Sequence, residues 1–169
     1  GSSKTVFSIA RYGNVMGSRG SVIPIFLKQN KNKNFFTITN KSMTRFTISL
    51  NEAVKFVFER IKDMKGGEIF VPKLESYRVI DLAKSINPKK KIKFIGIRNG
   101  EKIHEEMINP FEFNQIKEMK KYYKILPLVK ISDKTKNIYQ SYNSFNKGKF
   151  VSIKSLSKKI KLNLKDFEK

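Results

Sequence analysis

The apolar and polar residues of this chain follow two different periods. Thr5–Ala10 alternates apolar and polar residues, which predicts a strand. In residues 49–64 the apolar residues instead recur at helical spacing, which predicts an amphipathic helix. Ser49 and Glu52 form an S-x-x-E capping box at its start, and Gly66-Gly67 ends it. Its apolar face is expected to contain Leu50, Ala53, Val54, Val57, Ile61 and Met64.

Further segments follow the same two patterns. Strands are predicted over residues 35–39, 68–71, 91–96 and 122–129. Helices are predicted over residues 22–30, with Pro24 in the first turn, and over residues 77–87, 101–107 and 152–161. The alternation of strands and helices predicts an α/β fold. The chain offers too few parallel strands for a complete doubly wound nucleotide-binding domain.

Lysine dominates a strongly basic composition. The formal net charge is +22, because 36 basic residues stand against 14 acidic ones, and 30 of the 36 are Lys. Such a charge fits a nucleic acid or an anionic membrane surface as a partner. However, Lys, Asn, Ile and Phe make up 78 of the 169 residues, and all four have A/T-rich codons. Scattered lysines with few arginines favour compositional drift over a nucleic-acid reader.

The composition also restricts metal, disulfide and membrane chemistry. The chain has no Cys and a single His, so we expect neither disulfides nor a metal site. The chain contains no run of about 18 apolar residues, which is the length that would predict a membrane-spanning helix. The first residues do not resemble a secretion signal, and we therefore expect a cytoplasmic protein.

The segment RYGNVMGSRGSVIPIF (Arg11–Phe26) is a candidate ligand loop. Gly13, Gly17 and Gly20 would let backbone N–H groups approach a charged ligand, and Arg19 can bind phosphate oxygens. The alternative is a simple turn between a strand and a helix. The glycine spacing is not the G-x-G-x-x-G of a dinucleotide site.

Two further segments carry candidate ligand residues. In MTRF, Arg45 lies between apolar neighbours, where it either reaches a phosphate or snorkels to solvent. In GIRNGEK, Arg98 suits bidentate phosphate binding, and Glu101 can accept hydrogen bonds from vicinal hydroxyls of a ribose or sugar. A surface ion pair is the alternative there. The single His104 is interpreted as a packed or surface residue, not a general base.

Four segments together resemble one family. They are SSKTVFSIARYGNVMGSRGSVIPIF, ITNKSMTRFTISLNEAVKFV, GGEIFVPKLESYRVIDLAKSI and IGIRNGEKIHEEMI, in this order from Ser2 to Ile108. They are similar to the C-terminal half of the inverting UDP-N-acetylglucosamine 4,6-dehydratases, which belong to the extended short-chain dehydrogenase/reductase superfamily. YNSFN (Tyr142–Asn146) is similar to the tail motif of that family.

The resemblance implies a fold and a domain organisation. Residues 1–30 would end an NADP-binding Rossmann domain, residues 31–146 would form a small α/β domain that binds UDP-sugar, and residues 147–169 would form a basic tail with a helix. The family's catalytic Tyr-x-x-x-Lys and Asp-Lys pairs lie upstream of the matched half. The resemblance therefore implies a cytoplasmic lyase for surface glycan synthesis, homo-oligomeric when full length, of which this chain is a fragment without activity of its own.

The resemblance also assigns ligand roles to individual residues. The cofactor is NADP, and the stretch beside its nicotinamide is Val15, Met16, Gly17, Ser18 and Arg19. The substrate is UDP-N-acetylglucosamine, and the residues implied to bind it are Asn14, Val22, Thr39, Arg98 and Glu101, with Arg45 as an addition. Asn99 departs from the proline usual in the family, which loosens the turn that carries Arg98 and Glu101.

Two other functions remain open from the sequence. One is another nucleotide-sugar epimerase of the same superfamily, which would leave the C6 hydroxyl in place. The other is a basic nucleic-acid-binding module, which would bind DNA or RNA with a steep dependence on salt. The lysine-rich tail after Asn109 matches the family poorly, so the resemblance assigns it neither a fold nor a role.

Overall fold

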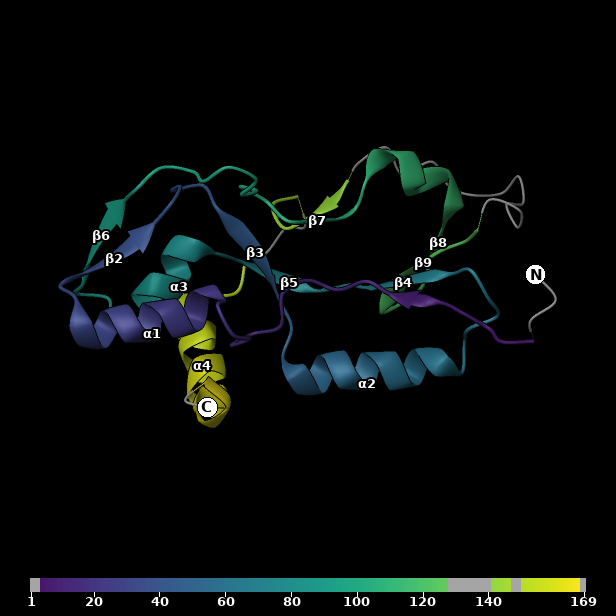
Figure 1. The fold of residues 1–169 in the computed structure, drawn as a ribbon, viewed down its shortest axis with the longest axis horizontal. Coiled ribbons are helices and arrows are strands. Elements are labelled where there is room, and N and C mark those ends of the chain that lie inside the picture. Colours follow the sequence, from purple (N-terminus) through teal and green to yellow (C-terminus); the bar gives the residue numbers. More distant parts are fainter. Residues whose placement is uncertain (1–3, 128–140, 147–149, 168–169) are drawn as a thin grey trace.

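The computed structural model describes residues 4–127, 141–146 and 150–167. Two groups of elements lie on either side of a central strand pair (Figure 1). The central pair is β3 (Thr44–Thr47) with β5 (Glu75–Arg78). The first group contains α1 (Val22–Asn32), β2 (Phe35–Ile38), α3 (Val79–Ile86), β6 (Lys91–Phe94) and α4 (Ile153–Phe167). The second contains β1 (Ile9–Ala10), α2 (Leu50–Ile61), β4 (Ile69–Pro72), η1 (Pro110–Gln115), β8 (Ile116–Glu118) and β9 (Tyr122–Ile125), with β7 (Glu106–Ile108) and β10 (Tyr142–Asn143) nearby.

The strands form small mixed sheets instead of one long parallel sheet. The largest has the order β1-β4-β9-β8, in which β1 and β4 are parallel and the other pairs are antiparallel. β2 and β6 form a separate parallel pair, and β3 and β5 an antiparallel one. This agrees with the predicted α/β class.

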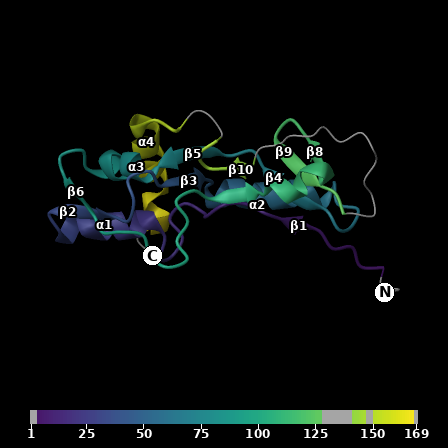
Figure 2. The same ribbon diagram turned by 90° about the horizontal axis from the view of Figure 1, so that it is seen from above.

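The first group of elements has its own apolar core. Phe26 of α1 and Phe36 of β2 are fully buried, with ring centroids 5.1 Å apart. Leu156 and Ile160 of α4 close this core against α3 (Figures 1 and 2). The tail helix is therefore part of the fold.

A second core lies under the largest sheet. Tyr142 packs on Phe46 of β3 and Tyr123 of β9, with ring centroids 5.1 and 5.2 Å away. Its hydroxyl accepts a hydrogen bond from the Leu74 amide at 2.6 Å and donates one to the Pro72 carbonyl at 3.2 Å. The YNSFN segment thus ties the second core to the strand pair in the centre.

Most predicted elements are confirmed, and the capping box is present as predicted. Of the strand predicted over residues 122–129, Tyr122–Ile125 form β9, and residues 128 and 129 lie outside the described residues. The Glu52 amide donates to Ser49 Oγ at 3.2 Å, and the Glu52 carboxylate accepts from the Ser49 amide at 2.7 Å. The predicted strand over Thr5–Ala10 is shorter than expected, because only Ile9 and Ala10 pair with β4.

The helix predicted over residues 101–107 is wrong. Its backbone groups bond to distant partners instead of to one another. The Thr44 amide donates to the Ile103 carbonyl at 3.0 Å, and the Glu105 amide donates to Ser144 Oγ at 2.9 Å. The helix predicted over residues 77–87 begins two residues later than predicted, at Val79, because Tyr77 and Arg78 pair with β3 as part of β5.

Candidate functional site

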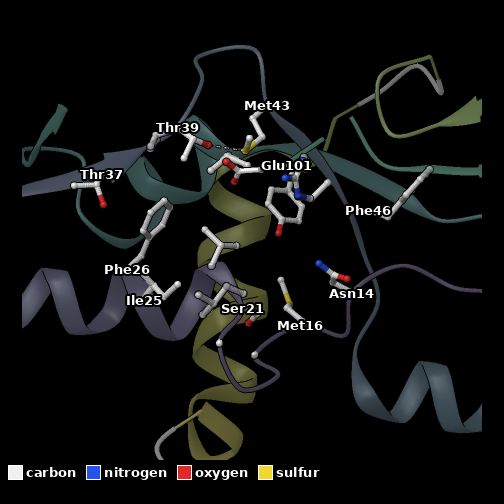
Figure 3. A pocket seen from close by; sticks show the side chains of 18 of the residues that line it. Asn14, Met16, Ser21, Ile25, Phe26, Thr37, Thr39, Met43, Phe46 and Glu101 are labelled. Carbon is white, nitrogen blue, oxygen red and sulfur yellow. Dashed lines mark hydrogen bonds between the residues drawn. The ribbon is translucent and has the colours of Figure 1, made fainter. Parts of the chain in front are cut away.

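A pocket of about 240 Å³ opens between the glycine loop, α1 and the central strands (Figure 3). The loop forms one wall because Val15 forms a bridge to Ile48, and the Met16 amide donates to the Ile48 carbonyl at 2.8 Å. Gly17 and Gly20 have φ values of 79° and 74°, which a side chain would strain. The glycines therefore let the loop turn back into α1 at the edge of the pocket.

Gly13 has a different role from the one that its position in the motif suggested. A Cβ at this position would lie 3.0 Å from Cβ of Phe46. Gly13 thus lets the loop pack closely on β3, and it does not line the pocket. At Gly13 the shape of the loop is therefore required for packing on β3.

The structure brings together most of the site residues predicted from the sequence. All of them except Ser18 and Arg19 line the pocket, and Figure 3 shows Asn14, Met16, Thr39 and Glu101 around its cavity. The lining members are Asn14, Val15, Met16, Gly17, Val22, Thr39, Arg45, Arg98 and Glu101. Ser18 and Arg19 lie in the exposed turn between Val15 and Ser21.

Arg45 is held rigidly at the wall of the pocket. Its Nη1 donates to the carbonyls of Thr44 at 2.7 Å and Ile103 at 3.1 Å. Its Nε lies 3.3 Å from Oε1 of Glu105. The side chain is only 12% exposed, so the snorkelling alternative does not describe it. The guanidinium is thus largely shielded from solvent and held in one position at the pocket wall, with the Glu105 carboxylate beside it.

Tyr77 is a pocket residue that the sequence analysis missed. It lies directly opposite Arg45 in the β3–β5 ladder and lines the same cavity. Burial raises the pKa of Tyr77 to about 12, so its hydroxyl is protonated at neutral pH. Burial does not alternate along β5, and the sequence predicts a helix from Tyr77 onwards, so no local pattern identifies Tyr77 as a pocket residue.

A chain of side-chain hydrogen bonds runs through Thr44, the residue that precedes Arg45. His104 Nδ1 lies 2.8 Å from Thr44 Oγ1, which lies 2.6 Å from Ser144 Oγ. The His104 ring also packs on Phe145, with centroids 4.8 Å apart. Burial and the Arg45 charge lower the pKa of His104, which favours its neutral form. His104 is thus a packed residue, as the sequence suggested.

Arg98 and Glu101 lie in one tight turn at the mouth of the pocket. The Glu101 amide donates to the Arg98 carbonyl at 3.0 Å, and Gly100 has φ of 78°. The Glu101 carboxylate accepts only a long bond, 3.3 Å, from the Arg98 amide. The Arg98 side chain is exposed and forms no ion pair with any residue that the structure describes. Its guanidinium is therefore available to an anionic ligand.

Two further features are absent from the part of the chain that the structure describes. Within it, no three His, Cys, Asp or Glu side chains gather as a metal ion would require. Among the described helices, none has the length and apolar character needed to cross a bilayer.

This chain is similar to known proteins both in sequence and in structure. The model of the polysaccharide biosynthesis protein family matches residues 1–127. A UDP-N-acetylglucosamine 4,6-dehydratase (inverting) from Campylobacter jejuni is 47% identical over 135 residues, which are 79% of this chain. A UDP-glucose 4-epimerase from Rickettsia bellii is 44% identical over 126 residues, which are 72% of this chain. The crystal structure of Pen from Bacillus thuringiensis superposes on 96% of this chain with a TM-score of 0.82 and 36% identity.

These relatives are much longer than the chain. The matched region covers 40% of the Campylobacter protein, 37% of the Rickettsia protein and 50% of the Pen chain.

Proposed function

The chain belongs to the polysaccharide biosynthesis protein family, and from this membership we propose that it is the substrate-binding portion of a UDP-N-acetylglucosamine 4,6-dehydratase. Its mixed α/β fold is consistent with part of an extended short-chain dehydrogenase/reductase. In the proposed reaction C4 is oxidised by loss of a hydride, water is eliminated across C5–C6, and the hydride is returned to C6, which leaves a 4-keto-6-deoxy hexosamine with inversion at C5.

One observation carries the proposal. Residues from three segments far apart in the sequence, Asn14–Gly17, Arg45 and Arg98–Glu101, meet around one pocket. The pocket combines two guanidinium groups with a carboxylate and with polar side chains such as Thr39. This donor set fits a nucleotide diphosphate that carries a sugar.

Each group has a proposed role. Arg98 binds diphosphate oxygens with its free guanidinium, and Glu101 accepts hydrogen bonds from vicinal hydroxyls. Arg45 adds a fixed positive charge, and Tyr77 a neutral hydroxyl donor. Asn14, Val22 and Thr39 contact the remainder of the UDP-sugar. The chain supplies binding and orientation to the reaction.

The cofactor proposed for the whole enzyme is NADP, which supplies hydride-transfer chemistry when bound. Val15, Met16 and Gly17 would lie beside its nicotinamide, because they form the loop wall of the pocket. Ser18 and Arg19 would contact parts of the cofactor outside this pocket. The sequence contains no Tyr-x-x-x-Lys, so we propose that the acid–base residues lie in the remainder of the enzyme.

The test is a complementation assay. The purified chain is incubated with UDP-N-acetylglucosamine and NADP, alone and with the segment of the Campylobacter relative that precedes the matched region. We expect no product from the chain alone and a product lighter by one water with both parts. Turnover by the chain alone would contradict the assigned division of roles.

The Rickettsia relative favours one alternative, a UDP-sugar 4-epimerase. The same assay distinguishes the two, because an epimerase product keeps its C6 hydroxyl and has the mass of the substrate. An epimerised product of unchanged mass would replace the dehydratase proposal.

A further inference from the structure

A second hollow lies between α3 and α4, and lysines surround it. Lys84 comes from α3, whereas Lys154, Lys158 and Lys161 come from α4. The three α4 residues follow each other at i, i+4 and i+7 and therefore share one face of the helix. All four side chains are exposed. We call this set the lysine hollow.

The charges of the lysine hollow are uncompensated. Within the described part of the chain, none of its four lysines forms an ion pair, whereas neighbouring Lys159 lies 2.7 Å from Glu75. Like charges four residues apart destabilise a helix. Lys154 also lies in the first turn of α4, where the helix dipole disfavours a cation. The arrangement therefore costs stability unless an anionic partner covers it.

Apolar side chains lie among these lysines. Leu162 is 73% exposed and Ile153 is 40% exposed, and both line the hollow with Pro88. Leu156 and Ile160 on the opposite side of α4 are buried in the first core. The helix is thus fixed in place with an exposed edge that combines lysines and aliphatic groups.

We propose that the lysine hollow docks the protein on the surface of an anionic lipid bilayer. Lysines would contact the acidic headgroups, and Leu162 would enter the boundary between headgroups and acyl chains. A nucleic acid fits less well, because the hollow has no arginine fork for phosphates or bases and no aromatic ring for base stacking. This surface is independent of the sugar-nucleotide pocket and of the function proposed for it.

The experiment is vesicle co-sedimentation of the full 169-residue chain, with phosphatidylcholine vesicles and with vesicles that also contain phosphatidylserine. The test variant carries Lys154→Gln, Lys158→Gln and Lys161→Gln. The control carries Lys117→Gln, Lys120→Gln and Lys121→Gln, which are exposed residues around β8 and β9. Both variants lower the net charge equally, from +22 to +19, because each removes three positive charges. Circular dichroism checks that both are folded.

We expect binding only to the vesicles with phosphatidylserine. The test variant should lose about 100-fold in affinity, because each lysine near an anionic surface contributes roughly five-fold. The control should bind like the original chain. Leu162→Gln should weaken binding without changing its salt dependence, since it removes no charge. Equal losses in both triple variants would overturn the proposal, as would tighter binding of a single-stranded oligonucleotide through the same lysines.

Discussion

Arg45 and Arg98 line the same pocket, but their guanidinium groups are in different states. Arg45 is bonded to two carbonyls and lies near the Glu105 carboxylate, whereas the Arg98 side chain is exposed. The two arginines therefore differ in what their loss should do. Removing Arg98 should affect mainly the ligand, while removing Arg45 should affect the fold as well.

The first prediction concerns Arg98. Arg98→Ala should weaken UDP binding by about 2 kcal/mol, because a charged hydrogen-bond donor to the diphosphate is lost. Isothermal titration calorimetry with UDP measures this change. Lys102→Ala is the matched control, since it removes one positive charge from the same loop. An unchanged dissociation constant for Arg98→Ala would reject its role in diphosphate binding.

The second prediction concerns Arg45. Arg45→Ala should lower the free energy of unfolding by about 3 kcal/mol, because it leaves the Thr44 and Ile103 carbonyls without their charged donor. Urea denaturation measures this loss. Arg98→Ala should stay within about 0.5 kcal/mol of the original chain, as for an exposed side chain. Equal stability of all three proteins would show that the contacts of Arg45 contribute nothing to the fold.

The third prediction concerns the pH dependence of stability. Glu68 is 2% exposed, and its carboxylate accepts hydrogen bonds from Ser8 Oγ and from the Lys65 and Gly66 amides. Burial alone would raise the pKa of Glu68, but the hydrogen bonds outweigh it and lower the pKa from 4.5 to about 2. The ionised carboxylate therefore stabilises the fold fully above about pH 4.5, and this stabilisation is lost as the pH falls towards 2.

Glu68→Gln should remove this dependence. We expect a loss of up to about 3 kcal/mol at neutral pH and a flatter stability curve between pH 4.5 and 2. Urea denaturation at a series of pH values measures both. Glu118→Gln is the control, because that side chain is 50% exposed and its ion pair with Lys73 contributes little. An unchanged slope in Glu68→Gln would contradict the assignment.

Among the elements, those with local signals could be predicted from the sequence. The capping box at Ser49 fixes the start of α2 as predicted. The helix ends at Ile61, three residues before the end of its predicted range, and the double glycine lies in the segment that follows. The segment 101–107 had a helical pattern, but Ile103 and Glu105 bond to Thr44 and Ser144, and these partners are distant in sequence. Local periodicity contains no information about such bonds.

The same limit applies to the pocket. The glycine loop and the two arginine segments could be identified, because their residue types indicate anion binding even without the fold. Tyr77 could not, since only its pairing with Arg45 across β3 and β5 places it in the cavity. The distinction between an anchored Arg45 and a free Arg98 also depends on the three-dimensional structure alone.

The fourth prediction concerns the start of α2. Ser49→Ala should lower the free energy of unfolding by about 1 kcal/mol, because the Glu52 amide loses its side-chain acceptor. The exposed neighbour Asn51 offers a control, and Asn51→Ala should change stability by less than about 0.5 kcal/mol. Urea denaturation of both variants tests this. Equal effects of the two substitutions would show that the capping box is not what stabilises the helix.

At the scale of the whole molecule, one apolar surface remains uncovered. Most of the predicted apolar face of α2 is exposed, and Ala53 is its one fully buried residue. The exposed apolar residues of α2, which we call the α2 face, are Leu50, Val54, Val57 and Ile61 from the predicted face, together with Phe58. Val6, Phe7 and Ile9 near β1 are also exposed. The five residues of the α2 face recur at helical spacing and therefore share one side of α2, and an exposed apolar helix face is typical of an interaction site.

The last prediction follows from the α2 face. At high concentration the isolated chain should self-associate through it, because burying about five aliphatic or aromatic side chains between copies is favourable. Analytical ultracentrifugation measures the sedimentation coefficient as a function of concentration. Phe58→Lys should reduce the association without loss of stability, since the side chain is 66% exposed. Phe111→Lys, a position that is 93% exposed and outside the α2 face, should have no effect.

If the upstream segment of the Campylobacter relative suppresses the association, the α2 face is a contact surface for the remainder of the enzyme. If the original chain stays monomeric at all concentrations, the α2 face does not drive association.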